Sequence, residues 1–247
     1  MSRFAPDHAG AEVRPSPNFG PRVGRIGPDM IILHYTGMVT GAAAEAWLCD
    51  EASNVSSHYL VHENGRIVQM VRERDRAWHA GKSSWRGVTD INSCSVGIEI
   101  VNPGHLLGYR NFPERQIEAV IELCKGVVAR HAILPERVLA HSDVAPGRKI
   151  DPGERFPWRR LAGAGIGHFV APARIGKDRP IGPGHHGPAV EELQSMLSTY
   201  GYGLEITGVF DEPTGVVVKA FQLHFRQRRI DGLADFSTVR TLQRLLG

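Results

Sequence analysis

The alternation of apolar and polar residues in the first two thirds of the chain predicts strands and helices in turn. "DMIILHYTG" (29–37) is an apolar run that ends at a turn glycine, and "TGAAAEAWLCDEA" (40–52) has a helix-forming composition. "SHYLVHENGRIVQMV" (57–71) places Asn64-Gly65 between two β-rich runs, which is the strongest short-range signal for a hairpin. The pattern therefore predicts a strand, a helix and a two-stranded hairpin in this order.

The pattern continues with one long helix and a short strand that leads into a polar loop. "SCSVGIEIVN" (93–102) predicts a strand buried on at least one face, and "PERQIEAVIELCKGVVARHAI" (113–133) places apolar residues at helical spacing after a proline. "RVLAH" (137–141) predicts a strand, and "FPWRRLAGA" (156–164) predicts a closing helix. This part of the chain is expected to be an α/β domain.

A change of composition divides the chain in two. Between 163 and 187 the residues are mainly those of linkers, in "GAGIGHFVAPARIGKDRPIGPGHHG", and three amphipathic segments follow. We therefore expect a larger domain at 15–162, which is long enough to hold an active site, a linker at 163–187 and a small three-helix domain at 188–247. No period recurs often enough to predict a solenoid.

Composition narrows the class of protein. Twenty-nine Lys and Arg against 26 Asp and Glu give a net charge of +3, and "FRQRR" (225–229) is the one basic block. This mild basicity suits an anionic polymer and argues against a dedicated nucleic-acid binder. The three cysteines are widely spaced and are expected to be free thiols. The first residues lack the apolar run of a secretory signal, and no segment is apolar enough to span a membrane, so a cytoplasmic protein is expected.

Three residues of metal-ligand type lie at the ends of predicted strands. His34 follows "IIL", His141 follows "RVLA", and Asp151 lies further along the loop "HSDVAPGRKIDPG". Two imidazoles and a carboxylate, with a fourth position left to water, are typical of a catalytic zinc site. The residues alone leave open another interpretation, in which His34 is a core histidine and Asp151 is a turn residue before proline.

A family resemblance favours the metal site. "ILHYTG", "SVGIEIVN" and "HSDVAPGRKIDPG" resemble the motifs of the zinc-dependent N-acetylmuramoyl-L-alanine amidases over residues 15–162. The resemblance implies a mixed central sheet flanked by helices and a Zn²⁺ held by His34, His141 and Asp151. It also implies catalytic roles for Glu99 and Lys149. In the second domain, "TGVFDEPTGVVVKAFQ" resembles the three-helix peptidoglycan-binding module of wall hydrolases.

The implied chemistry requires these residue types. Amide hydrolysis needs an activated water, a stabilised oxyanion and a proton for the departing nitrogen, and a bound zinc ion lowers the pKa of water and polarises a carbonyl. Glu99 would act as the base and then as the acid, and the ammonium group of Lys149 would lie near the oxyanion. Asp143 is expected to be structural, in a local side-chain turn.

Three other groups of residues have weaker signals. His79 is expected either to contact substrate or to pack beside Trp78. His58 and His62 are spaced too far apart along a strand to share a metal ion. In the C-terminal domain the phenylalanines are expected in the core, whereas Tyr200 and Tyr202 would be available at the surface.

These observations predict a monomeric enzyme that cuts the amide between N-acetylmuramic or anhydro-N-acetylmuramic acid and L-alanine. The expected partners are peptidoglycan or anhydro-muropeptides, without nucleic acid or membrane, and the expected role is muropeptide recycling in the cytoplasm. Alternatives are an exported, periplasmic amidase that acts on intact wall, a binding protein without activity, and a zinc peptidase that cuts within the stem peptide. The C-terminal domain either binds glycan or packs against the catalytic domain. On a flexible linker its removal would leave the turnover of small muropeptides unchanged.

Overall fold

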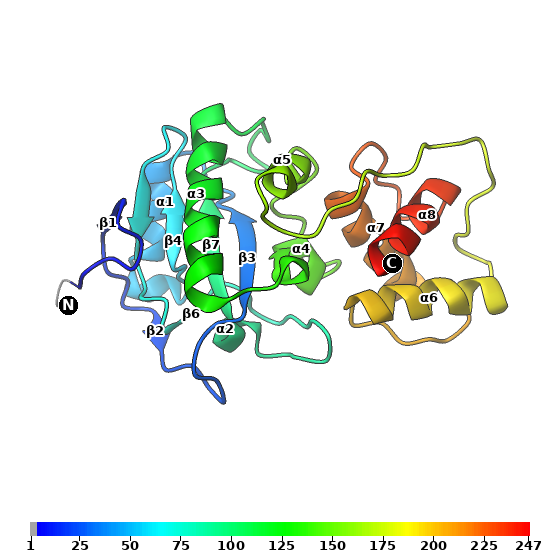
Figure 1. The fold of residues 1–247 in the computed structure, drawn as a ribbon, viewed down its shortest axis with the longest axis horizontal. Helices are drawn as coiled ribbons and strands as arrows, with labels where there is room; N and C mark the ends of the chain where they lie inside the picture. The colour runs from blue at the N-terminus through cyan, green and yellow to red at the C-terminus, as the bar shows by residue number, and fades with distance from the viewer. Residues whose placement is uncertain (1–3) are drawn as a thin grey trace.

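A six-stranded mixed sheet forms the centre of the larger domain in the computed structural model, which describes residues 4–247 (Figure 1). The strand order is β1-β5-β4-β7-β3-β8, and every neighbouring pair is parallel except β4 and β5. The strands are β1 (Ala11–Val13), β3 (Met30–Tyr35), β4 (Tyr59–Val61), β5 (Ile67–Gln69), β7 (Ser95–Ile100) and β8 (Val138–Ala140). A separate two-stranded sheet pairs β2 (Phe19–Gly20) with β6 (Arg76–Ala77).

Helices cover both faces of the central sheet. They are α1 (Gly41–Leu48), α2 (Ile91–Cys94), α3 (Glu114–His131), α4 (His141–Val144) and α5 (Trp158–Gly163), with short 3₁₀ turns η1 (Glu51–Ser53) and η2 (Pro135–Arg137). The long α3 crosses one face, and α1 lies on the other (Figure 1). The predicted α/β architecture of a mixed sheet flanked by helices is therefore confirmed.

The alternation of side chains along β3 assigns its residues to the two faces. Ile31 and Leu33 are fully buried in the cluster that α3 completes. Met30 and Ile32 are fully buried on the opposite face, in a cluster that includes Trp85. Because side chains alternate along a strand, His34 belongs to the same face as Met30 and Ile32.

Most predicted elements occur where the pattern placed them, with shorter bounds. The hairpin around Asn64-Gly65 joins β4 to β5, and Gly65 has the positive φ that such a turn requires. The segment 93–102 differs from the prediction because its first residues belong to α2, which Asp90 caps through the backbone N–H of Ser93. Similarly, the helix predicted over 40–52 ends at Leu48.

Three helices make up the C-terminal module, by which we mean residues 188–247. They are α6 (Pro188–Tyr200), α7 (Glu212–Phe225) and α8 (Phe236–Leu246). Asp211 and Asp235 cap α7 and α8 by accepting hydrogen bonds from backbone N–H groups in the first turns. The predicted helices of this module are confirmed.

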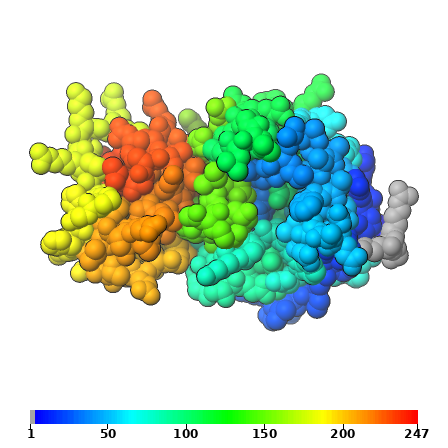
Figure 2. Space-filling model, turned by 180° about the vertical axis from the view of Figure 1, so that it is seen from behind, coloured from blue at the N-terminus to red at the C-terminus, as the bar shows by residue number. Residues whose placement is uncertain are grey.

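The C-terminal module packs directly against the catalytic domain, and Figure 2 shows the two in contact along the face turned to the viewer. One buried cluster contains Met30, Trp85 and Val144 of the catalytic domain together with Val217 and Phe221 of α7. The shared cluster means that the module has a fixed place in the fold.

The connecting segment 164–187 has no helix or named strand, but parts of it are packed. Ile166 and Ala173 are buried, and the backbone N–H of Ala173 donates to the hydroxyl of Thr241 in α8. The structure therefore does not contain the freely moving tether that glycine and proline content would favour.

The expectation of surface tyrosines is also wrong, because Tyr200 and Tyr202 are only 3% and 2% exposed. Phe221, Leu223 and Phe225 are buried as predicted.

The structure bears on two further expectations, that no segment spans a membrane and that the cysteines are free thiols. No helix within residues 4–247 combines the length and the apolar character that a bilayer crossing needs. Cys49, Cys94 and Cys124 are all free, and the last two are buried.

Candidate metal centre and active site

The parallel register of three strands brings the predicted site together. His34 in β3 is the register partner of Glu99 in β7, and Leu33 is the partner of Ala140, the last residue of β8. His141 follows Ala140 directly as the first residue of α4. Because the carboxyl ends of parallel strands lie at one edge of a sheet, His34, Glu99 and His141 meet there.

The predicted ligands converge as a compact group of three donor atoms. Nδ1 of His34 lies 2.9 Å from Nδ1 of His141, and Oδ2 of Asp151 lies 3.2 Å and 3.0 Å from these two nitrogens. The three residues are buried: His34 is 1% exposed, His141 is 2% exposed and Asp151 is 6% exposed. The loop is closed behind them, because the backbone N–H of Ser142 donates to the carbonyl of Asp151 at 3.0 Å. The sequence prediction of a His-His-Asp cluster is therefore borne out as geometry.

The hydrogen bonds of His141 define its tautomer. Its Nε2 lies 3.1 Å from the carbonyl oxygen of Ala80, which can only accept, so Nε2–H donates. In the neutral ring Nδ1 then carries a lone pair that faces His34 and Asp151. Carbonyl partners of this kind orient the histidine ligands of metal sites.

A chain of hydrogen bonds defines the tautomer of His34 in the same way. Ser95 Oγ–H donates to the carbonyl of Ile91 at 2.6 Å, so its oxygen is left to accept from Nε2–H of His79 at 3.2 Å. In neutral His79 Nδ1 is therefore an acceptor, and it receives Nε2–H of His34 at 3.0 Å. His34 is left with a lone pair on Nδ1, which points into the donor group.

Gly97 provides the space for His79. A Cβ atom at Gly97 would lie 2.5 Å from two atoms of the His79 ring, which is closer than side chains tolerate. The glycine of the "SVGIEIVN" motif therefore lets the ring lie against β7. Of the two roles expected for His79, neither included this contact, because nothing in the sequence indicates that residue 79 meets the end of β3.

The electrostatics favour a neutral His34, a neutral His79 and an ionised Asp151. Burial, with the neighbouring His141 acting in the same direction, lowers the pKa of His34 to about 4. Burial also lowers the pKa of His79 well below its usual value, assisted by His34. Burial alone would raise the pKa of Asp151, but its contacts with the His141 and His34 side chains outweigh burial and lower that pKa. Neutral imidazoles and a carboxylate are the forms that bind a metal cation.

The donor group fits a tetrahedral zinc ion. Metal–ligand distances of about 2.0–2.1 Å place the corners of a tetrahedron about 3.3 Å apart. The separations of 2.9–3.2 Å among the three donor atoms are close to this edge length. Three donors leave one corner free, as catalytic zinc sites do.

Glu99 has an unusual environment for a carboxyl group. Its Oε2 is buried and has no hydrogen-bond partner among the described residues. Burial raises the pKa of Glu99 well above its usual value, the carboxylate of Asp151 raises it further, and Lys149 opposes the shift. A carboxyl group in such surroundings is suited to exchange protons near neutral pH.

A cavity of about 560 Å³ opens beside these residues. Glu99, His141, Lys149 and Asp151 are among its lining residues. Three aromatic side chains, Tyr35, Trp47 and Trp78, are among the other lining residues. The half-buried Lys149 therefore faces the same space as Glu99, as the resemblance implied.

Other residues that the sequence singled out lie outside the donor group. His58 is fully buried, its Nδ1 accepts from the backbone N–H of Gly97, and neither His58 nor His62 belongs to the metal-type cluster found in residues 4–247. Asp143 accepts the expected local hydrogen bond from the backbone N–H of Ala140. Its other partners lie in the C-terminal module, far along the chain.

The fold and this site together define an α/β protein with the three-donor arrangement of catalytic zinc. The chain belongs to the N-acetylmuramoyl-L-alanine amidase family, enzymes that hydrolyse the amide bond for which they are named, and the family model matches residues 24–154. Residues 186–242 match a putative peptidoglycan binding domain.

Relatives extend the similarity to both domains. The Escherichia coli (strain K12) N-acetylmuramoyl-L-alanine amidase AmiD is 40% identical over 230 residues, which cover 88% of this chain and 82% of AmiD. A putative amidase of Rickettsia conorii is 30% identical over 83% of this chain and 79% of its own length.

Solved structures show the same fold. AmiD, in complex with anhydro-N-acetylmuramic acid-L-Ala-D-gamma-Glu-L-Lys, has a TM-score of 0.75 at 37% identity and covers 94% of this chain and 92% of its own. AmpDh3 of Pseudomonas aeruginosa has a TM-score of 0.74 at 30% identity and covers 98% of both chains.

Proposed function

We propose that this enzyme is zinc-dependent and hydrolyses the amide between anhydro-N-acetylmuramic or N-acetylmuramic acid and L-alanine in soluble peptidoglycan fragments, as muropeptide recycling requires. One observation carries the proposal. Two histidines and an aspartate converge at the end of parallel strands, beside a buried carboxyl oxygen that has no hydrogen-bond partner among residues 4–247.

His34, His141 and Asp151 would hold the zinc ion. When bound, zinc supplies a Lewis acid that polarises the amide carbonyl and lowers the pKa of a water molecule. The residues of the chain carry out the remaining tasks. His79 and the carbonyl of Ala80 keep the two imidazoles in the tautomers that leave Nδ1 free.

Glu99 is proposed to move the protons. Its unpartnered Oε2 is free to accept a proton from the attacking water, and the raised pKa allows the resulting carboxylic acid to donate to the leaving nitrogen. Lys149 is proposed to place its positive charge near the developing oxyanion.

The choice of a soluble muropeptide follows the relatives. AmiD was solved with an anhydro-muramyl tripeptide, and AmpDh3 was solved with an anhydromuramic pentapeptide. The cavity beside Glu99 is lined by aromatic and polar side chains, which suits a sugar that carries a peptide. Intact peptidoglycan is the alternative substrate, and the family of residues 186–242 is the observation that favours it.

A cytoplasmic, monomeric enzyme is part of the proposal, with the periplasm as the alternative compartment. Three free thiols are typical of a reducing compartment. Fractionation of cells and detection of the protein in each fraction would decide between the two compartments, and sedimentation of the pure protein would test the monomer.

The central experiment is a digest of one anhydro-muramyl tripeptide followed by mass spectrometry. We expect free anhydro-N-acetylmuramic acid and the intact peptide, loss of both products after zinc removal, and their return when zinc is added. Products cut within the stem peptide would indicate a peptidase, and binding without any product would indicate a recognition protein. Full activity of the metal-free protein would contradict zinc dependence.

A further inference from the structure

A buried aspartate connects the metal-site loop to the C-terminal module. Asp143 is the third residue of α4, two residues after His141, and it is 0% exposed. Its Oδ2 accepts a hydrogen bond of 2.8 Å from the backbone N–H of Ala140, the last residue of β8. The carboxylate thus holds the start of the short helix that carries a metal donor.

Two residues of the module complete the surroundings of Asp143. The hydroxyl of Tyr202, in the loop after α6, donates to Oδ1 at 2.7 Å. Nδ1–H of His224, near the end of α7, donates to Oδ2 at 2.6 Å. Both residues are 2% exposed. A buried carboxylate destabilises the fold unless it accepts hydrogen bonds. The hydroxyl of Tyr202 and the N–H of His224 therefore stabilise the buried position of Asp143.

Packing fixes the positions of the two donors. The ring of His224 stacks on Trp158 of α5, with 3.7 Å between centroids and 25° between planes. The ring of Tyr202 meets Trp85 edge to face at 5.0 Å. Trp158 and Trp85 both belong to the catalytic domain, so each donor is held by an aromatic contact across the domain boundary.

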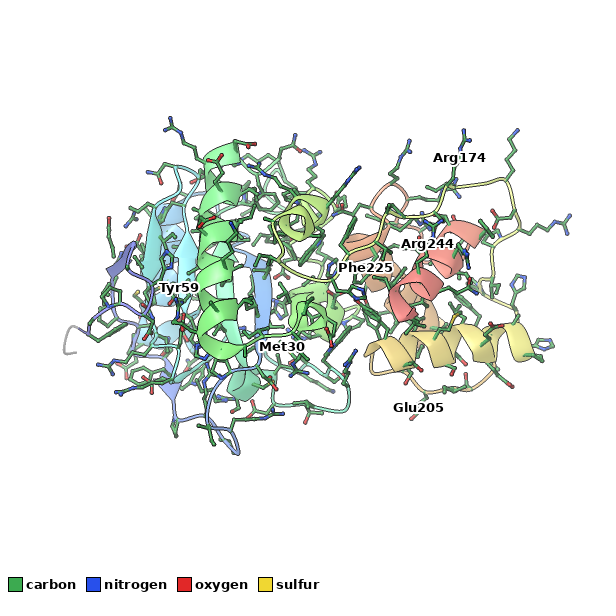
Figure 3. The ribbon with its side chains drawn as sticks, viewed as in Figure 1. Met30, Tyr59, Arg174, Glu205, Phe225 and Arg244 are labelled. Carbon is green, nitrogen blue, oxygen red and sulfur yellow. The ribbon has the colours of Figure 1, made fainter. Side chains whose placement is uncertain are left out.

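The backbone of the module approaches the catalytic domain closely at the same place. A Cβ atom at Gly201 would lie 2.5 Å from the Trp85 ring, and the carbonyl of Gly201 accepts from the backbone N–H of Arg86 at 2.8 Å. Phe225, the residue after His224, lies where α7 faces the catalytic domain (Figure 3). The module therefore has one defined orientation at Asp143.

We propose that Tyr202 and His224 are positioning residues for the metal ligand His141, and that they act through Asp143. In this view the C-terminal module is part of the catalytic unit, whether or not it also binds glycan. The physical reason is that α4 has only four residues, and the carboxylate that anchors it takes two of its three hydrogen bonds from the module. The inference rests on the proposed zinc site.

Tyr202→Phe is the most informative variant, because it removes one hydroxyl and keeps the ring against Trp85. The matched control is Tyr200→Phe. Tyr200 is also buried, at 3% exposed, and also packs against Trp85, but its hydroxyl lies 3.3 Å from His168 instead of Asp143. A second pair tests the other donor, since His224→Asn keeps a side-chain N–H and His224→Leu removes it.

The measurement is the zinc dissociation constant of the full-length protein, by competition with a chromogenic chelator, together with the melting temperature of the metal-free form. Partners outside the first ligand shell typically change metal affinity about 10- to 100-fold. We expect Tyr202→Phe and His224→Leu to weaken zinc binding on the order of 10-fold, and Tyr200→Phe to leave it within about 2-fold. His224→Asn should recover part of the affinity lost in His224→Leu.

A double-mutant cycle separates positioning from general destabilisation. If Tyr202 acts through Asp143, then Tyr202→Phe should weaken zinc binding much less in an Asp143→Asn background than in the wild type. Equal zinc affinity of Tyr202→Phe and Tyr200→Phe would overturn the inference, as would additive effects of Tyr202→Phe and Asp143→Asn. A wild-type protein that binds no zinc would instead overturn the proposed function.

Discussion

His79 provides the sharpest test of how the metal centre is organised. Replacement of His79 by leucine removes the acceptor for Nε2–H of His34 and leaves this buried donor without a partner. An unsatisfied buried donor costs about 1–3 kcal/mol. At about 1.4 kcal/mol for each factor of ten, this corresponds to a loss of zinc affinity of about 5- to 150-fold. Substitutions beyond the first ligand shell have effects of similar size.

The assay is the zinc dissociation constant of purified variants, measured by chelator competition at fixed pH. His79→Gln offers an amide oxygen as acceptor, so we expect it to bind zinc more tightly than His79→Leu. Gly97→Ala should reproduce part of the loss, because the new Cβ atom would displace the His79 ring.

His58→Gln is the control, since His58 is fully buried and its hydrogen bonds go to Gly97, Asp75 and Arg22 and not to His34. Zinc affinity of His79→Leu within twofold of the wild type, with an unchanged fold, would refute the reasoning.

Four further outcomes are expected. Glu99→Gln should retain zinc and lose about 10²–10⁴-fold in kcat, because only the proton transfers are removed; loss of metal and fold together would make Glu99 structural. Lys149→Met should lower kcat more than it changes KM, by the same kinetic assay. Burial and the neighbouring Arg22 lower the pKa of His58 to about 3, so the stability from this residue is complete above pH 6.5 and is lost as the pH falls toward 3. At about 1.4 kcal/mol per unit, the loss at pH 4 is about 3 kcal/mol, and urea unfolding at pH 7 and pH 4 should show a smaller difference for His58→Gln. Deletion of 164–247 should expose a shared core and reduce the turnover of small muropeptides, contrary to the expectation for a tethered module; undiminished turnover would support the tether.

The metal centre could be predicted from the sequence because its parts lie at the ends of strands. His34 follows the apolar run of one predicted strand, and His141 follows the shorter apolar run of another. Parallel strands bring such ends to one edge of a sheet. Residue types and spacing alone favoured a core histidine and a turn aspartate, and the family resemblance decided for the metal site. The roles proposed for Glu99 and Lys149 came from the resemblance, because a glutamate in a strand can equally lie on a solvent face and a loop lysine is usually solvated.

The surroundings of the ligands could not be predicted in this way. His79 lies 45 residues from His34 and belongs to a loop after β6, whose position relative to β3 depends on the whole fold. The requirement for glycine at position 97 could not be predicted either. A side chain is excluded there only because the His79 ring lies against β7 in the folded protein. Contacts of this kind depend on tertiary packing, on which local periodicity carries no information.

The linker composition left the place of the C-terminal module open, although the sequence of α7 contained a relevant signal. Glycine and proline in 164–187 describe the local backbone, and they do not determine whether the domains that they join make contact. The helix "EPTGVVVKAFQLHF" buries nine of its 14 residues, on more than one side. A small three-helix unit covers one stripe of each helix, so a helix that is apolar around most of its circumference needs a second partner. That partner is the catalytic domain, and one of the buried polar residues of α7, His224, meets the buried carboxylate of Asp143. The other buried polar residues of α7, Thr214 and Gln222, bond within the module, so His224 is the one whose partner lies across the domain boundary among the described residues.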